Sequence, residues 1–146
     1  MQIPDNLSNE IKDLCAEADC FVGMGEFSAA HNNYISALDL VPEPKEAFQT
    51  TVWILAALGD MYFKAKDYAQ AKNVLTDSMH CVGAIGNPFL HLRLGQAQLE
   101  LGESDRAADE LCRAYMGAGR DIFEREDPKY FVFLKGKIAP PAGGEW

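Results

Sequence analysis

Apolar residues recur along this chain at intervals of three and four positions, the spacing that places them on one face of an α-helix. Leu14, Ala18, Phe21 and Val22 form an early example. The spacing predicts helices over residues 8–23, 26–40, 46–65, 68–82, 88–101 and 104–125, and a short closing helix over 128–138. The last residues, 139–146, read APPAGGEW and are expected to form a flexible tail.

A glycine pair in the segment GMGEFSAA opens a G-x-G-x-x-G pattern, but Ser28 stands where the third glycine would be. A phosphate-binding loop of that kind connects a strand to the start of a helix. Here the residues before Gly23 have helical spacing instead. We therefore interpret Gly23 and Gly25 as the end of one helix and the turn into the next.

The helical pattern occurs three times. In each unit a small residue stands twelve positions before an alanine, and a large apolar residue follows that alanine by four positions. The three sets are Ala18, Ala30 and Tyr34; Gly59, Ala71 and Leu75; and Gly95, Ala107 and Leu111. Small residues at matched positions allow paired helices to approach closely, and hairpins that repeat bury their apolar faces against one another.

These positions resemble the tetratricopeptide (TPR) signature, W-x₂-L-G-x₂-Y followed by A-x₃-F and P. The middle unit matches best, with Leu58-Gly59-x-x-Tyr62, whereas Gln98 replaces the aromatic residue in the third unit. The resemblance implies an all-α fold in which antiparallel helical hairpins stack as a short solenoid with a C-terminal capping helix. The expected domain, residues 1–138, contains three repeats at about 11–44, 52–85 and 88–121 and the capping helix at about 128–138, before the tail at 139–146.

The sixth helix is expected to run long, because helical spacing continues to Ile122. Gly117 and Gly119 interrupt this stretch, and glycine is unfavourable inside a helix. The sequence leaves open whether these glycines break the helix.

The chain is acidic, with a formal net charge of −9 and a pI near 4.7. Such a surface repels phosphate backbones, so no nucleic-acid partner is expected. No apolar run is long enough to cross a bilayer, and the first ten residues lack the basic and apolar regions of a signal peptide. We therefore expect a cytoplasmic protein that does not bind membranes.

Cysteine and histidine spacing gives no support to a metal site. Cys15, Cys20, Cys81 and Cys112 form no C-x-x-C pair, and the histidines form no H-E-x-x-H motif. His31 and His91 are expected at the surface or in a groove. Catalytic motifs such as G-x-S-x-G and the P-loop are absent as well, so we expect no enzyme activity, cofactor or metal.

In TPR arrays the first helix of each pair lines a concave groove that holds the partner. The resemblance therefore implies partner-binding positions at Asp19, Trp53, Asp60, Phe63, Lys64, Phe89, Arg93, Gln96 and Glu100. Trp53, Phe63 and Arg93 belong to types that are prominent in binding hot spots. Two alternatives stay open: Trp53 could be a core residue between repeats, and Arg93 could form a surface ion pair.

The closing helix is unusually apolar. Tyr130, Phe131, Phe133 and Leu134 cover more than one of its faces. We expect this helix to pack within its own chain on two faces. The alternative is a second interface, with a partner or in a homodimer.

The chain's size and its ending, YMGAGRDIFEREDPKYFVFLKGKI, are similar to those of small bacterial TPR proteins, some of which resemble immunity proteins encoded beside secreted toxins. That resemblance implies a non-catalytic module that binds and neutralises a toxin. An acidic array would capture a basic toxin quickly, because complementary charge speeds association. The alternatives are an acidic TPR-type secretion chaperone, which binds an exported protein, and a scaffold in a larger complex.

Overall fold

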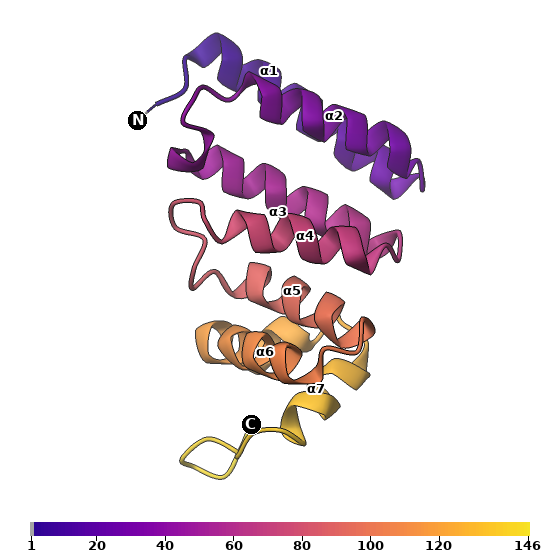
Figure 1. The fold of residues 1–146 in the computed structure, drawn as a ribbon, viewed down its shortest axis with the longest axis vertical. Helices are drawn as coiled ribbons and strands as arrows, with labels where there is room; N and C mark the ends of the chain where they lie inside the picture. Colours follow the sequence, from indigo (N-terminus) through magenta and orange to yellow (C-terminus); the bar gives the residue numbers. More distant parts are fainter. Residues whose placement is uncertain (1) are drawn as a thin grey trace. The chain divides into compact units, whose positions relative to one another are not determined.

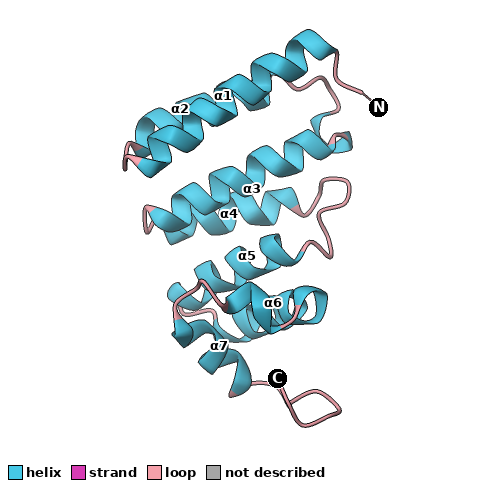
Figure 2. Cartoon of the chain, turned by 180° about the vertical axis from the view of Figure 1, so that it is seen from behind, coloured by secondary structure: helices cyan, strands magenta, loops and turns pink. Residues whose placement is uncertain are grey.

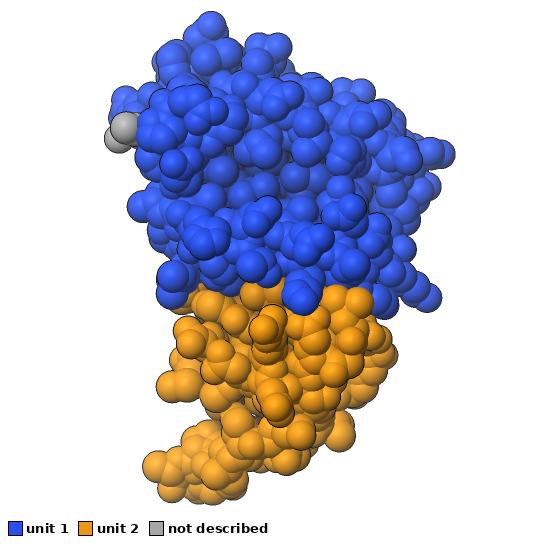
Figure 3. Space-filling view, in the orientation of Figure 1, with its two compact units in different colours: residues 1–85 blue, residues 86–146 orange. Residues whose placement is uncertain are grey.

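The computed structural model describes residues 2–146, and every regular element in that range is helical (Figures 1 and 2). The α-helices are α1 (Asp5–Gly23), α2 (Phe27–Leu40), α3 (Gln49–Lys64), α4 (Tyr68–Ser78), α5 (Pro88–Glu100), α6 (Ser104–Ala118) and α7 (Pro128–Lys135). Two short 3₁₀ helices, η1 (Lys45–Ala47) and η2 (Arg120–Phe123), lie between them. The chain divides into two compact units, residues 1–85 and 86–146, which are described one at a time (Figure 3).

The first unit contains two helical hairpins. Helix α1 packs on α2, α3 packs on α4, and α2 contacts α3. The turn that closes the first hairpin confirms the interpretation of Gly23 and Gly25 as a helix end and a turn. Helix α1 ends at Gly23, and Gly25 adopts a φ of 76°. Ala18 and Ala30, which face each other's helices in the repeat pattern, are both fully buried.

Close helix approach explains the small residue in the middle repeat. A Cβ atom on Gly59 would lie 2.5 Å from Cδ2 of Leu75, well inside van der Waals contact. The turn of this hairpin places Lys66 at a φ of 62°, and the carboxylate of Asp67 then caps α4 by accepting a hydrogen bond from the backbone N–H of Gln70 at 3.2 Å. The predicted helical hairpin is confirmed at both its packing contact and its turn.

The connection between α2 and α3 corrects the prediction of one helix over residues 46–65. Residues 45–47 form the 3₁₀ helix η1, and α3 begins only at Gln49. The ammonium group of Lys45 donates hydrogen bonds to the backbone oxygens of Leu38, at 3.0 Å, and Val41, at 2.5 Å. Lys45 thus satisfies carbonyl groups at the C-terminal end of α2, where a positive charge is favourable. The helix is interrupted at Phe48, whose backbone is extended with φ −106° and ψ 132°.

The second unit contains the α5–α6 hairpin and the C-terminal elements. Asn87 caps α5 with its side-chain oxygen, and a Cβ atom on Gly95 would lie 2.8 Å from Cγ of Leu111. The long sixth helix is wrong: α6 ends at Ala118, because Gly119 takes a φ of 71° and the chain continues as η2. Helix α4 likewise ends at Ser78 rather than 82.

Helix α7 begins at the predicted residue but ends at Lys135, three residues before the predicted end. Asp127 caps it by accepting a hydrogen bond from the N–H of Lys129 at 3.0 Å. Beyond α7 the indole of Trp146 contacts the rings of Tyr115 and Phe131, with centroids 5.6 and 5.9 Å apart. The flexibility of this tail and the single domain over residues 1–138 stay predictions.

Candidate functional site

A hollow of about 250 Å³ lies between α1 and α3 in the first unit, and we call it the α1–α3 hollow. Its apolar wall includes Ile11, Cys15 and Ile54, and its polar side includes Asp19. Trp53 lies at its edge with 62% of its surface exposed, so this residue is not part of the core. Two predicted partner-binding residues, Asp19 and Trp53, therefore line the same hollow.

The Asp19 carboxylate is held in place by a buried tyrosine. The hydroxyl of Tyr34, on α2, donates a hydrogen bond to Oδ1 of Asp19 at 2.5 Å. Burial and this contact with Asp19 strongly raise the pKa of the Tyr34 hydroxyl, which therefore remains a donor. Sequence reasoning missed this pair because Asp19 and Tyr34 lie on different helices. Tyr34 follows the repeat alanine and was assigned only to packing.

Cys15 lines the same hollow. Burial, and secondarily the charge of Asp19, raise the pKa of its thiol. A protonated thiol is a poor nucleophile and a poor metal ligand, so Cys15 contributes apolar wall to the hollow. All four cysteines are free thiols in the structure.

The other predicted residues of α3 lie outside this hollow. Asp60 and Lys64 form an ion pair on the helix surface, with Nζ and Oδ2 2.9 Å apart. The ring of Phe63 contacts Tyr68 of α4 edge-on, with centroids 5.6 Å apart. Phe63 therefore packs within its own hairpin in addition to any contact with a partner.

In the second unit, the structure places Arg93 and Gln96 in a buried polar network. The Arg93 guanidinium donates to Oε1 of Gln96 at 2.7 Å and to Oε1 of Glu126 at 2.5 Å. The Gln96 amide donates to the same oxygen of Glu126 at 2.8 Å. The ion pair anticipated for Arg93 is present, but it is buried rather than exposed. Because its side chain is buried against Glu126, Arg93 exposes little surface to a partner.

Glu100 is engaged with α7 in a similar way. Its carboxylate accepts hydrogen bonds from the Tyr130 hydroxyl at 2.7 Å and from the Lys129 ammonium at 2.5 Å. The Lys129 contact is the main cause that lowers the pKa of Glu100. The ring of Phe89, the remaining predicted residue, lies beneath the Arg93 guanidinium, with its centroid 5.1 Å from Cζ of Arg93. All four predicted groove residues of the third repeat, Phe89, Arg93, Gln96 and Glu100, therefore contact groups of their own unit.

The closing helix packs within its unit through part of its apolar surface. Tyr130 and Leu134 are buried, whereas Phe131 and Phe133 are partly exposed. Packing of this helix on its own chain is therefore observed for Tyr130 and Leu134. A second interface through Phe131 and Phe133 stays a prediction.

The expectation that His91 lies at the surface or in a groove is wrong, because only 3% of the residue is exposed. Its ring is buried, Nδ1 lies 2.5 Å from Oε2 of Glu110, and Nε2 accepts a hydrogen bond from the N–H of Gly86 at 2.9 Å. Both ring nitrogens are thus engaged. Within residues 2–146, no group of three histidine, cysteine or acidic side chains is arranged to bind a metal ion.

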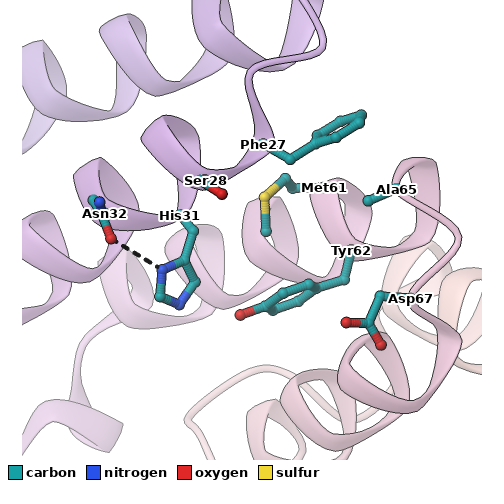
Figure 4. A pocket seen from close by; sticks show the side chains of 8 residues that line it. All are labelled: Phe27, Ser28, His31, Asn32, Met61, Tyr62, Ala65 and Asp67. Carbon is teal, nitrogen blue, oxygen red and sulfur yellow. Dashed lines mark hydrogen bonds between the residues drawn. The ribbon is translucent and has the colours of Figure 1, made fainter.

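A second hollow, of about 340 Å³, lies between α2 and the C-terminal end of α3 in the first unit (Figure 4). We call it the α2–α3 hollow. Its lining includes Phe27, His31, Met61, Tyr62 and Asp67. Sequence reasoning missed it, although Tyr62 is the aromatic residue of the repeat signature and Asp67 lies in the turn that follows.

Comparisons with known proteins identify the fold. The sequence matches no protein-family model and no curated protein. The structure is similar to the C-terminal TPR-containing domain of an FK506-binding protein of Plasmodium falciparum, with a TM-score of 0.67, 18% identity, and 88% of this chain and 85% of that chain covered. It is also similar to the TPR domain of Arabidopsis OM64, with a TM-score of 0.67, 16% identity, and coverage of 90% and 99%.

The fold is a short TPR-type helical solenoid. At this level of identity the similarity concerns the fold alone. None of the helices in the described part of this TPR-type chain is long and apolar enough to cross a membrane.

Proposed function

We propose that this chain is a non-catalytic module that binds a partner protein through the α1–α3 hollow. The observation that carries the proposal is Trp53, a large aromatic side chain that is mostly exposed at the edge of an apolar hollow. Tryptophan is enriched among residues that dominate binding energy. The oriented Asp19 carboxylate beside it would add directional recognition of a donor or cation on the partner.

The partner we favour is a basic toxin, which this chain would neutralise in the cytoplasm as an immunity-type protein. The net charge of −9 supports a basic partner, because complementary charge increases the rate of encounter. The secretion chaperone and the scaffold are the alternatives. All three functions would use the α1–α3 hollow, together with the predicted residues Asp60, Phe63 and Lys64, which lie outside it further along α3.

The test uses the purified product of the gene adjacent to this one as the candidate partner. Trp53→Ala is expected to weaken binding by about 2 kcal/mol, roughly thirtyfold, with little change in the free energy of unfolding. Met116→Ala is the matched control, because Met116 is also exposed, at 79%, but lies in the second unit. Equal affinities for the wild type and Trp53→Ala would reject the α1–α3 hollow.

Co-expression separates the three partner classes. If this chain is an immunity-type protein, it should restore growth to cells that express the adjacent gene, and Trp53→Ala should not. A secretion chaperone would instead bind an unfolded segment of an exported protein. A scaffold would bind without either effect.

A further inference from the structure

The α2–α3 hollow differs from the α1–α3 hollow in both place and chemistry. It lies at the junction of the second helix of one hairpin and the end of the first helix of the next (Figure 4). Aromatic rings and one carboxylate line it, and no lysine or arginine does. The α1–α3 hollow, in contrast, includes Lys12.

Two aromatic rings form one wall of the α2–α3 hollow. The rings of His31 and Tyr62 contact each other with centroids 6.0 Å apart and an interplanar angle of 54°. Both side chains are partly exposed, and Phe27 lies on the same hollow. Aromatic faces carry partial negative charge and attract cations, and a planar guanidinium can also stack on them.

A carboxylate lies beside these rings. Asp67 is exposed, and the hydrogen bond that caps α4 uses its Oδ1 atom. Burial is the main cause that raises the pKa of the neighbouring Tyr62 hydroxyl, and the charge of Asp67 is the second cause. The charge of Asp67 therefore acts on a residue that lines the hollow. Three helix ends lie at the hollow, because α2 begins there, α3 ends there and α4 begins directly after Asp67. Each helix end contributes only about half a unit charge and the opposite ends partly cancel, whereas the Asp67 carboxylate carries a full charge. Asp67 therefore sets the sign of the site, which is negative.

We propose that the α2–α3 hollow binds an arginine side chain of a basic polypeptide, as a second contact separate from the α1–α3 hollow. The guanidinium stacks on Tyr62 and His31 and donates hydrogen bonds to Asp67. The hollow, at about 340 Å³, accommodates a guanidinium and the end of its aliphatic stem. Arginine fits better than lysine because its planar group uses the ring faces and the carboxylate at once. The net charge of −9 favours a basic polypeptide as the carrier of this guanidinium.

The test uses small probes rather than an unidentified partner. N-acetyl-arginine methylamide is titrated into the ¹⁵N-labelled protein at about pH 8, where histidine is ordinarily neutral. We expect amide shifts concentrated at residues 28–32 and 62–67. The citrulline counterpart has the same shape without charge and should bind about threefold to tenfold more weakly, as expected for loss of a partly exposed ion pair and a cation–π contact. Equal binding of the two probes would overturn the proposal in favour of a neutral site.

Two acidic variants distinguish a defined site from diffuse attraction. Asp67→Asn removes the charge but keeps a good N-cap residue, and should weaken arginine binding about as much as the citrulline change does. Glu17→Gln removes an exposed charge of α1 outside the hollow and should leave it unchanged. Equal losses in both variants, or shifts spread over α1, would overturn the proposal. Should Asp67→Asn lose its fold, the comparison of arginine with citrulline on the wild type still decides.

The aromatic contribution is tested at Tyr62. Tyr62→Phe retains the ring and should keep most of the arginine affinity, whereas Tyr62→Leu should lose it to about the level of the citrulline probe. Equal affinities of these two variants would contradict stacking. Trp53→Ala should not change binding of the probe, so failure of this proposal and failure of the proposed function give different results.

Discussion

Arg93 shows how a residue type that suits a binding surface can serve internal packing instead. Its guanidinium shares the Glu126 carboxylate with Gln96 inside the second unit. Arg93→Met would leave Glu126 as an uncompensated, mostly buried charge. We expect a loss of about 3–5 kcal/mol in the free energy of unfolding, measured by urea denaturation.

The control for Arg93 is Arg113, whose ion pair with Asp109 is largely exposed. Arg113→Met should cost less than about 1 kcal/mol. Similar small losses at both positions would mean that the Glu126 pair does not exist in solution. A charge reversal such as Arg93→Glu is accordingly expected to lower the free energy of unfolding, so a loss of partner binding in that variant would not by itself identify Arg93 as a binding residue.

Gly59 offers a second test at the scale of single atoms. The methyl group of Gly59→Ala would meet Leu75 at 2.5 Å, so we expect overpacking to destabilise the protein by about 1–3 kcal/mol. Gly23→Ala is the matched control, because nothing lies within 4 Å of its added methyl group. Thermal or urea unfolding that ranks the two variants equally would contradict the close approach of α3 and α4.

At the scale of elements, α7 is joined to α5 by the Glu100 carboxylate, whose pKa is lowered mainly by Lys129. A carboxylate with a lowered pKa in the folded state stabilises that state above the pKa of the unfolded chain, and this stabilisation is lost as the pH falls through the folded pKa. Glu100→Gln should therefore be less stable than the wild type at about pH 7, and the difference should shrink below about pH 4.

Urea midpoints measured across that pH range check this expectation. Glu124→Gln serves as control, because Glu124 is an exposed acidic residue of the same unit. A difference between the wild type and Glu100→Gln that stays constant with pH would show that the Glu100 contacts do not form.

At the scale of the whole molecule, one tryptophan lies in each compact unit, at Trp53 and Trp146. Trp146→Phe leaves a fluorescence reporter in residues 1–85, and Trp53→Phe leaves one in residues 86–146. A single domain over residues 1–138 would unfold cooperatively, so we expect both reporters to show one shared urea transition. Two separate midpoints would mean that the units unfold independently and would contradict the single domain predicted for residues 1–138.

The sequence by itself determined the helical hairpins and their turns. Periodic apolar positions, the matched small residues and glycines such as Gly25 act through local geometry, because helical spacing and positive φ values depend on near neighbours in the chain. The buried state of Ala18 and Ala30 and the close approach of Leu75 to Gly59 follow from the same repeat.

Helix ends were less predictable where a distant group competes with the local pattern. The start of α3 at Gln49 follows from the extended backbone of Phe48, and the preceding Lys45 bonds through its ammonium to carbonyl groups of α2. Apolar spacing carries no information about such a contact. Gly119 was recognised as a potential break, but whether α6 ended there depended on the backbone conformation that packing selects.

Only the tertiary structure decided which polar residues are available to a partner. Helical position placed Arg93 and Trp53 on equivalent helices, yet Arg93 is satisfied by Glu126, 33 residues away, and Trp53 remains exposed. The α2–α3 hollow likewise exists because two helices distant in sequence bring His31 beside Tyr62. The physical reason is that hydrogen-bond partners and cavities are properties of side chains that meet in space, whereas sequence spacing specifies only the face on which each side chain lies.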